Sequence, residues 1–244
     1  MHGLDWLPER IREPIDQAVG AIASGLGPKL VAVCLIGPAA RDDRPLRGSH
    51  AELLVVSRNL DAATLADLAE GLAAPLRAGL QIRTVTSAEL ASSVDVHALE
   101  IAQWRDHHLL LAGTDPFASL DIASADLRHE IERAIRSLSQ RLRNRMLWCL
   151  ATEQIRLDAV LRESLETLTM LAHHTLTLVG EAAPRDEDAL LERFIAWSGR
   201  APEPVMNLRR RLDAPRAADD PLAELASLTA TTEAICARVD MLRV

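Results

Sequence analysis

The sequence predicts an α/β (α+β) domain followed by an all-α helical bundle. Two near-continuous apolar runs, 30–37 and 52–57, are typical of strands that helices cover on both faces. From Ser124 onward, every strongly periodic segment instead has the spacing of a helix. We therefore expect the first domain over residues 1–118 and the helical bundle over residues 119–244.

Two amphipathic helices are expected in the first domain. Apolar residues recur every three or four positions over 4–26, and Gly25 and Gly27 supply the end of this helix. Asn59 and Asp61 are the candidate N-caps of the second helix. Its apolar stripe consists of five leucines: Leu60, Leu65, Leu68, Leu72 and Leu76.

Two further strands complete the predicted sheet. Residues 80–86 alternate in polarity, as in a strand, and this places Gln81 and Arg83 on one side. Residues 96–117 are expected to form a short helix, then a strand from His107 to Leu111, and then a Gly-Thr-Asp-Pro turn. The strand-type patterns end there.

The remainder of the chain is expected to form helices that glycines and prolines separate, with Ser124 and Asp186 as candidate N-caps. The periodic segments are 126–150, 153–179, 186–199, 203–212 and 221–242. Trp104, Trp148 and Trp197 lie among apolar residues at helical spacing, so we expect them to anchor the core or a domain interface.

The composition is that of a soluble protein. Of the 244 residues, 48% are hydrophobic and 25% are charged, and the mean hydropathy is +0.04. No apolar stretch reaches the roughly 18 residues of a membrane span, and the N-terminus lacks the basic-then-apolar order of a secretory signal. We therefore expect a cytoplasmic protein with no membrane partner.

The charge balance argues against nucleic acid as a partner. A net charge of −8 opposes binding to a polyanion, because such binding draws on the neutralisation of phosphates. The chain also lacks tyrosine, which is one common residue for stacking on bases. The cysteines, Cys34, Cys149 and Cys236, are odd in number and far apart, so neither a disulfide framework nor a zinc site is expected.

The most informative segment is 31–56, VAVCLIGPAARDDRPLRGSHAELLVV, in which two apolar strands flank a glycine turn and an arginine-rich loop. Its GPAAR is similar to the Gly-Ser-x-x-Arg of the nucleotidyltransferase superfamily with the polymerase β-like fold. Its SHAELLVV is similar to the Ser-Asp-x-Asp-hydrophobic segment of that superfamily. The switch to helices resembles its bacterial two-domain members, in which a helical bundle follows.

That resemblance implies a mixed sheet, a glycine turn whose backbone approaches the nucleotide phosphates, and alternate carboxylates on the next strand. Side chains on a strand repeat every two residues, so such carboxylates project together. In active members they hold two magnesium ions, which stabilise the attacking and leaving oxygens of an in-line transfer.

This sequence departs from the superfamily pattern at its polar positions. Pro38 replaces the hydroxyl residue and removes a backbone N–H from the phosphate turn. His50 stands at the first aspartate, where imidazole is a poor ligand for magnesium, and Glu52 stands at the second. The resemblance makes His50 and Glu52 degenerate catalytic positions. It implies nucleotide-binding roles for four residues: Gly37, Pro38, Arg41 and Arg83.

Active members of the superfamily carry a third acid on a later strand, and 80–86 is the candidate for that strand. It offers Gln81 and Arg83 on its polar side and no carboxylate. If Arg83 faces Glu52, the two would form an ion pair in the vacated metal site. We therefore expect a site without a metal cofactor.

A second cluster of arginines lies in the helix predicted over 127–146. Arg133, Arg136 and Arg143 share one side of it. They form either a solvated face paired with neighbouring glutamates or a lining of the cleft that binds phosphate in place of metal.

Two functions remain open at this level. The first is a nucleotidyltransferase-like protein with an impaired metal site that acts as a regulator. It would bind a nucleotide, or it would bind a protein partner through the bundle. A homodimer is one form that such a regulator can take. The second is an active transferase that moves a nucleoside monophosphate from a nucleoside triphosphate to a small-molecule or protein hydroxyl. It would need Mg²⁺ and a displaced acid such as Asp42 or Asp43 beside Glu52. A scaffold that binds no nucleotide is a plainer third case.

Overall fold

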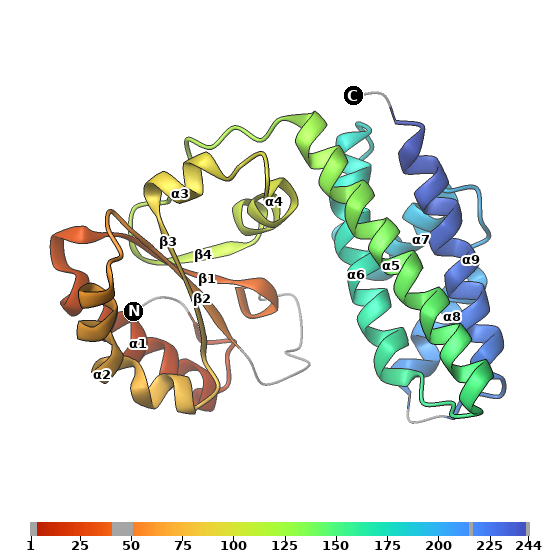
Figure 1. Ribbon diagram of the computed structural model, residues 1–244, viewed down its shortest axis with the longest axis horizontal. Helices are drawn as coiled ribbons and strands as arrows, with labels where there is room; N and C mark the ends of the chain where they lie inside the picture. The colour runs from red at the N-terminus through yellow and green to blue at the C-terminus, as the bar shows by residue number, and fades with distance from the viewer. Residues whose placement is uncertain (1–3, 41–50, 215–216, 243–244) are drawn as a thin grey trace. The chain divides into compact units, whose positions relative to one another are not determined.

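The computed structural model describes residues 4–40, 51–214 and 217–242. The chain divides into two compact units, Met1–Ile122 and Ala123–Val244 (Figure 1). The first contains the β-sheet and the second is helical.

A four-stranded mixed sheet forms the centre of the first unit. The strands are β1 (Leu30–Ile36), β2 (Glu52–Ser57), β3 (Gln81–Thr86) and β4 (His108–Gly113), in the order β3-β2-β1-β4. β1 pairs antiparallel with both β2 and β4, whereas β2 pairs parallel with β3. All four predicted strands are therefore present, and the sheet is mixed as the resemblance implies.

Helices cover both faces of this sheet, as the apolar runs predicted (Figure 1). On one face, α1 (Glu9–Leu26) and α2 (Ala62–Arg77) bury one side of each central strand, including Leu35 and Leu53. On the other face, α3 (Ser87–Ser92) and α4 (Ala98–Asp106) pack over the alternate side chains, including Cys34 and Leu54. The period of two in β1 and β2 divides their residues between two cores.

The first two helices differ in detail from the prediction. α1 begins at Glu9 rather than residue 4, because the residue before a proline avoids helical conformations and Pro8 stands immediately before the helix. Asp61 is confirmed as the N-cap of α2, where its Oδ1 accepts the Thr64 N–H at 2.8 Å. Leu65 and Leu76 are 44% and 47% exposed, so the buried stripe of α2 is narrower than predicted.

Sequence reasoning missed α3, although its start carries a clear signal. Thr86 and Glu89 form a capping box: Thr86 Oγ1 accepts the Glu89 N–H at 3.1 Å, and Glu89 Oε2 accepts the Thr86 N–H at 2.8 Å. Thr-x-x-Glu is the sequence signature of this motif. The helix is only 6 residues long, too short to show helical periodicity.

The second unit contains the predicted helices. They are α5 (Ser124–Thr152), α6 (Asp158–Leu178), α7 (Glu187–Trp197), α8 (Glu203–Asp213) and α9 (Pro221–Asp240). Asp186 is confirmed as the N-cap of α7, since its Oδ1 accepts the Ala189 N–H at 2.8 Å. Ser124 is not a cap: it lies inside α5, whose N-cap is Ala123, and Asp126 supplies the negative charge that favours a first turn.

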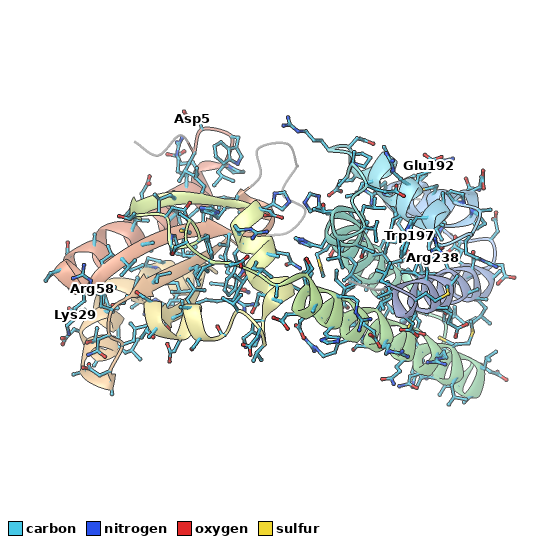
Figure 2. The ribbon with its side chains drawn as sticks, turned by 90° about the horizontal axis from the view of Figure 1, so that it is seen from above. Asp5, Lys29, Arg58, Glu192, Trp197 and Arg238 are labelled. Carbon is cyan, nitrogen blue, oxygen red and sulfur yellow. The ribbon has the colours of Figure 1, made fainter. Side chains whose placement is uncertain are left out.

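Aromatic and ionic contacts join the helices of the bundle. The Trp197 ring stacks on Phe194 at 5.8 Å, and the Arg238 guanidinium of α9 lies 5.5 Å from the Trp197 ring (Figure 2). Arg211 of α8 donates to Glu224 of α9 at 2.6 Å and to Asp158 of α6 at 2.9 Å. Trp197 is thus an anchor within the bundle, as predicted, whereas Trp148 is 40% exposed and is no core residue.

Across the described parts of the chain, every helix is too short or too polar to cross a lipid bilayer.

Candidate functional site

The candidate site begins where β1 ends. Ile36 pairs with Glu52 on β2 and with His108 on β4, and Glu52 pairs with Gln81 on β3, so one row of residues crosses the sheet. Gly37 follows Ile36 with a φ of +71°, and a Cβ at this position would meet nothing within 4 Å. Glycine is needed there for the backbone conformation rather than for space.

Strand geometry brings Glu52 and Arg83 together. Glu52 and Leu54 project from the same face of β2 because they are two residues apart. Leu54 is the register partner of Arg83 on β3, so Arg83 projects from that face as well. Arg83 Nε donates a hydrogen bond to Glu52 Oε1. The ion pair predicted between these two residues is confirmed.

A third member of the cluster comes from α4. Arg83 Nη1 donates to Glu100 Oε1 at 2.6 Å, and the guanidinium carbon lies 5.8 Å from the centre of the Trp104 ring. Glu100 and Trp104 are four residues apart, so they lie one above the other on the same side of the helix. α4 is fixed to the sheet by Ile101, which is 1% exposed. We call Glu52, Arg83, Glu100 and Trp104 the guanidinium cluster.

The electrostatics of the guanidinium cluster favour a cation that is fixed in place. The hydrogen bond with Glu52 raises the pKa of Arg83 above its already high ordinary value, against a smaller opposing effect of burial. The side chains of Arg83, Glu52 and Glu100 are 50%, 24% and 35% exposed. Solvent therefore screens the pairs in part, and their net contribution to stability is about 1 kcal/mol.

The side chains that the structure describes at this site do not suit a magnesium ion as ligands. Glu52 is the carboxylate at the second ligand position of the pattern, and its Oε1 already accepts from Arg83. Within the residues that the structure describes, no group of three side chains able to hold a metal includes Glu52. A divalent ion at Glu52 and Glu100 would have to displace the guanidinium that both carboxylates bind.

The other predicted site residues are less informative. His50 and Arg41 lie outside the described residues, as do Asp42 and Asp43. Pro38 belongs to the short 3₁₀ turn Gly37–Ala40, and its side chain lies outside the description as well.

His108 is a residue of this region that sequence reasoning did not single out as part of a site. Its Nδ1 lies 2.8 Å from the carbonyl oxygen of Trp104, which places a proton on Nδ1. Its Nε2 lies 3.6 Å from Asp115 Oδ1, and its ring contacts Phe117 edge-on with centroids 4.8 Å apart. His108 thereby fixes the end of α4 that carries Trp104.

The three arginines predicted to share one side of α5 are paired with acidic neighbours. Arg133 donates to both oxygens of Glu130, at 2.7 and 2.8 Å, and Arg136 donates to Glu132 at 3.0 Å and to Asp240 at 2.8 Å. Arg143 lies 3.8 Å from a Glu233 oxygen. These contacts favour the solvated, ion-paired face over a phosphate-binding role.

Comparison with known proteins supports the fold. No protein-family model and no curated protein matches the sequence. The solved structure of spectinomycin adenyltransferase AAD(9) from Enterococcus faecialis, determined with ATP and spectinomycin, is similar to this chain with a TM-score of 0.59. The two sequences are 13% identical, and the match covers 94% of this chain and 99% of that one. The chain therefore has the polymerase β-like nucleotidyltransferase fold, continued by a helical C-terminal region.

Proposed function

We propose that this protein is a nucleotidyltransferase-like regulator with an impaired metal site, which binds a nucleotide without metal, or a protein partner, and transfers no nucleotidyl group. The observation that carries the proposal is the position of Arg83, whose guanidinium binds Glu52 and Glu100 together. Binding of a nucleotide is supported by the fold and by the glycine turn at Gly37.

The chemistry of nucleotidyl transfer explains why Arg83 matters. Magnesium requires hard oxygen ligands close to octahedral geometry, so free carboxylate oxygens are needed beside the triphosphate. A guanidinium stays charged at every accessible pH and offers its N–H groups in a fixed plane. It can neutralise a carboxylate, but it cannot take oxygen ligands or lower the pKa of a hydroxyl as a bound metal does.

An active transferase remains the second candidate, because the similar structure is that of an adenyltransferase determined with ATP. In that case a metal would displace Arg83 from Glu52, and activity would depend on both the metal and Glu52. The two candidates therefore differ in their dependence on divalent ions.

Calorimetry with ATP and GTP, with and without Mg²⁺ or Mn²⁺, separates them. For the proposed regulator, the dissociation constant of the nucleotide changes little on addition of metal, and nucleotide labelled at the α-phosphate gives no labelled product. Tight binding that requires magnesium and is abolished in Glu52→Ala would overturn the proposal. Glu89→Ala, which alters a carboxylate in the α3 cap and none in the guanidinium cluster, is the matched control.

A further inference from the structure

The side chain of His108 ties strand β4 to the C-terminal end of helix α4. The chain passes from α4 to β4 through His107 alone (Figure 1). His108 then turns back toward the helix: its Nδ1 lies 2.8 Å from the carbonyl oxygen of Trp104 and 3.2 Å from that of Arg105. A carbonyl oxygen can only accept a hydrogen bond, so Nδ1 carries the proton that the two carbonyl groups share.

The last turn of α4 depends on this link because burial does not hold it. The buried residues of the helix all lie within 98–102, and residues 103–106 are half-buried or exposed. The last carbonyl groups of a helix have no partners within it. Here the Gln103 carbonyl accepts the His107 N–H at 2.9 Å, and the next two carbonyls accept from His108.

The His108 ring is itself held in one orientation. Its Nε2 lies 3.6 Å from Asp115 Oδ1, and the same oxygen accepts the Phe117 N–H at 2.8 Å. Phe117 is 2% exposed and contacts the imidazole edge-on, with the ring centroids 4.8 Å apart. The imidazole therefore cannot swing away from α4 without breaking a contact with a buried aromatic ring.

Trp104 carries the effect of this link to the guanidinium cluster. Its ring packs against the core of the first unit and lies 5.8 Å from the guanidinium carbon of Arg83. We propose that His108 is a positioning residue for Arg83. By holding the last turn of α4, it keeps the Trp104 ring beside the guanidinium, and this confines Arg83 to its two carboxylates. The inference deepens the proposed function, because a confined Arg83 is what keeps a metal ion from Glu52.

Confinement also leaves one part of the guanidinium available to a ligand. Arg83 donates from Nε to Glu52 and from Nη1 to Glu100, whereas its Nη2 forms no hydrogen bond with the residues that the structure describes. A guanidinium that is already fixed loses less entropy when it binds a phosphate oxygen than a mobile one does. Nucleotide binding through Arg83, which rests on the proposed function, would then weaken on loss of the His108 link, without any contact between His108 and the nucleotide.

Two substitutions separate the hydrogen bond of His108 from the packing of its ring. His108→Phe keeps a ring against Phe117 and removes the donor, whereas His108→Asn loses the ring and keeps an N–H at the place of Nδ1. Heteronuclear NMR at fixed pH measures hydrogen exchange of the Arg83 Nε–H, whose signal is assigned by its absence in Arg83→Lys. We expect His108→Phe to speed this exchange about two- to tenfold, the equivalent of one hydrogen bond, and His108→Asn to stay close to the wild type.

Asp61→Ala is the matched control. It removes a cap hydrogen bond from α2, which covers the opposite face of the same sheet, so the Arg83 Nε–H should exchange at the wild-type rate. Equal acceleration by Asp61→Ala, or none by His108→Phe, overturns the proposal. The wild type alone provides a second test, because NMR of the imidazole nitrogens should show the proton of neutral His108 on Nδ1. A neutral ring protonated only on Nε2 overturns the link to α4.

Calorimetry with ATP in the absence of metal separates this proposal from the proposed function. Weaker binding of ATP by His108→Phe, together with faster exchange at Arg83, supports both. Faster exchange with an unchanged dissociation constant for ATP upholds His108 as a positioning residue and counts against nucleotide binding by Arg83. Unchanged exchange in a His108→Phe variant that circular dichroism shows to be folded overturns the positioning role, whatever its affinity for ATP.

Discussion

The guanidinium of Arg83 donates its Nε–H to the carboxylate of Glu52 across the parallel pair of strands β3 and β2. The same guanidinium also binds Glu100, so one cation is shared between a strand and a helix. The resemblance of SHAELLVV to the Ser-Asp-x-Asp pattern predicts a metal ligand at the Glu52 position. Its partner is instead a side chain of the protein itself.

Removal of that cation is expected to create affinity for divalent ions. In Arg83→Ala, Glu52 and Glu100 would face each other without a positive charge between them. A unit charge about 4 Å from a dication repels it by about 2 kcal/mol even in water, so removal should strengthen Mn²⁺ binding more than tenfold. Electron paramagnetic resonance of free Mn²⁺ during titration measures the change.

The double variant Arg83→Ala with Glu52→Ala is the control for that titration, and it should return the Mn²⁺ affinity to the weak wild-type level. If Arg83→Ala binds Mn²⁺ no better than the wild type, the two carboxylates do not form a cation site.

The pairing of Arg83 with Glu100 is expected to contribute only modestly to stability. Arg83 is half exposed, and ion pairs in such positions are worth about 0.5–1 kcal/mol. A double-mutant cycle with Arg83→Met and Glu100→Gln, followed by urea unfolding, measures this coupling. A coupling of several kcal/mol would mean that the cluster is a main support of the first unit rather than a replacement for a ligand.

The sequence was sufficient to predict the sheet and one pair in the site. A period of two in the strands assigns each residue to a face, so Glu52 and Arg83 could be placed on the same side once β2 and β3 were neighbours. Glu100 could not be found in that way. It reaches the site from α4, and the direction in which a short helix packs is decided by tertiary contacts such as those of Ile101.

The helical half shows the same limit. Spacing predicted the helices, because periodicity and the Gly and Pro breaks are local signals. Which apolar residues become buried depends on neighbouring helices, so Trp148 was expected to be an anchor and is instead 40% exposed. The left-handed conformation of Glu153 also has no local sequence signal, since glycine or asparagine is the usual residue there.

Gly113→Ala is expected to destabilise the first unit strongly. Gly113 ends β4 with a φ of +85°, and an added Cβ would overlap the Val31 carbonyl oxygen and lie 2.9 Å from Ala32 Cα. Backbone strain and overlap with a neighbouring strand together should cost about 2–4 kcal/mol. Urea unfolding measures the cost.

Gly180→Ala is the control for this substitution. Gly180 has a φ of +76° but nothing within 4 Å of the added Cβ, so only the backbone term applies, about 1 kcal/mol. Equal losses in the two variants would show that the approach of β1 to Gly113 has no energetic importance.

Asp61→Asn is expected to make the stability of the protein less sensitive to acid. The hydrogen bond from the Thr64 N–H lowers the pKa of Asp61 below its ordinary value of 3.8. A carboxylate whose folded pKa is lowered stabilises the protein fully above its ordinary pKa, and this contribution is lost as the pH falls through the folded value. Asparagine retains an oxygen for the Thr64 N–H and does not titrate. Thermal unfolding between about pH 5 and about pH 2 should therefore show a smaller loss of stability in Asp61→Asn than in the wild type.

Asp67→Asn, which removes a carboxylate from the exposed side of α2 without altering the cap, should leave the wild-type profile of stability against pH unchanged. Equal flattening by both variants would assign the effect to net charge and not to the cap.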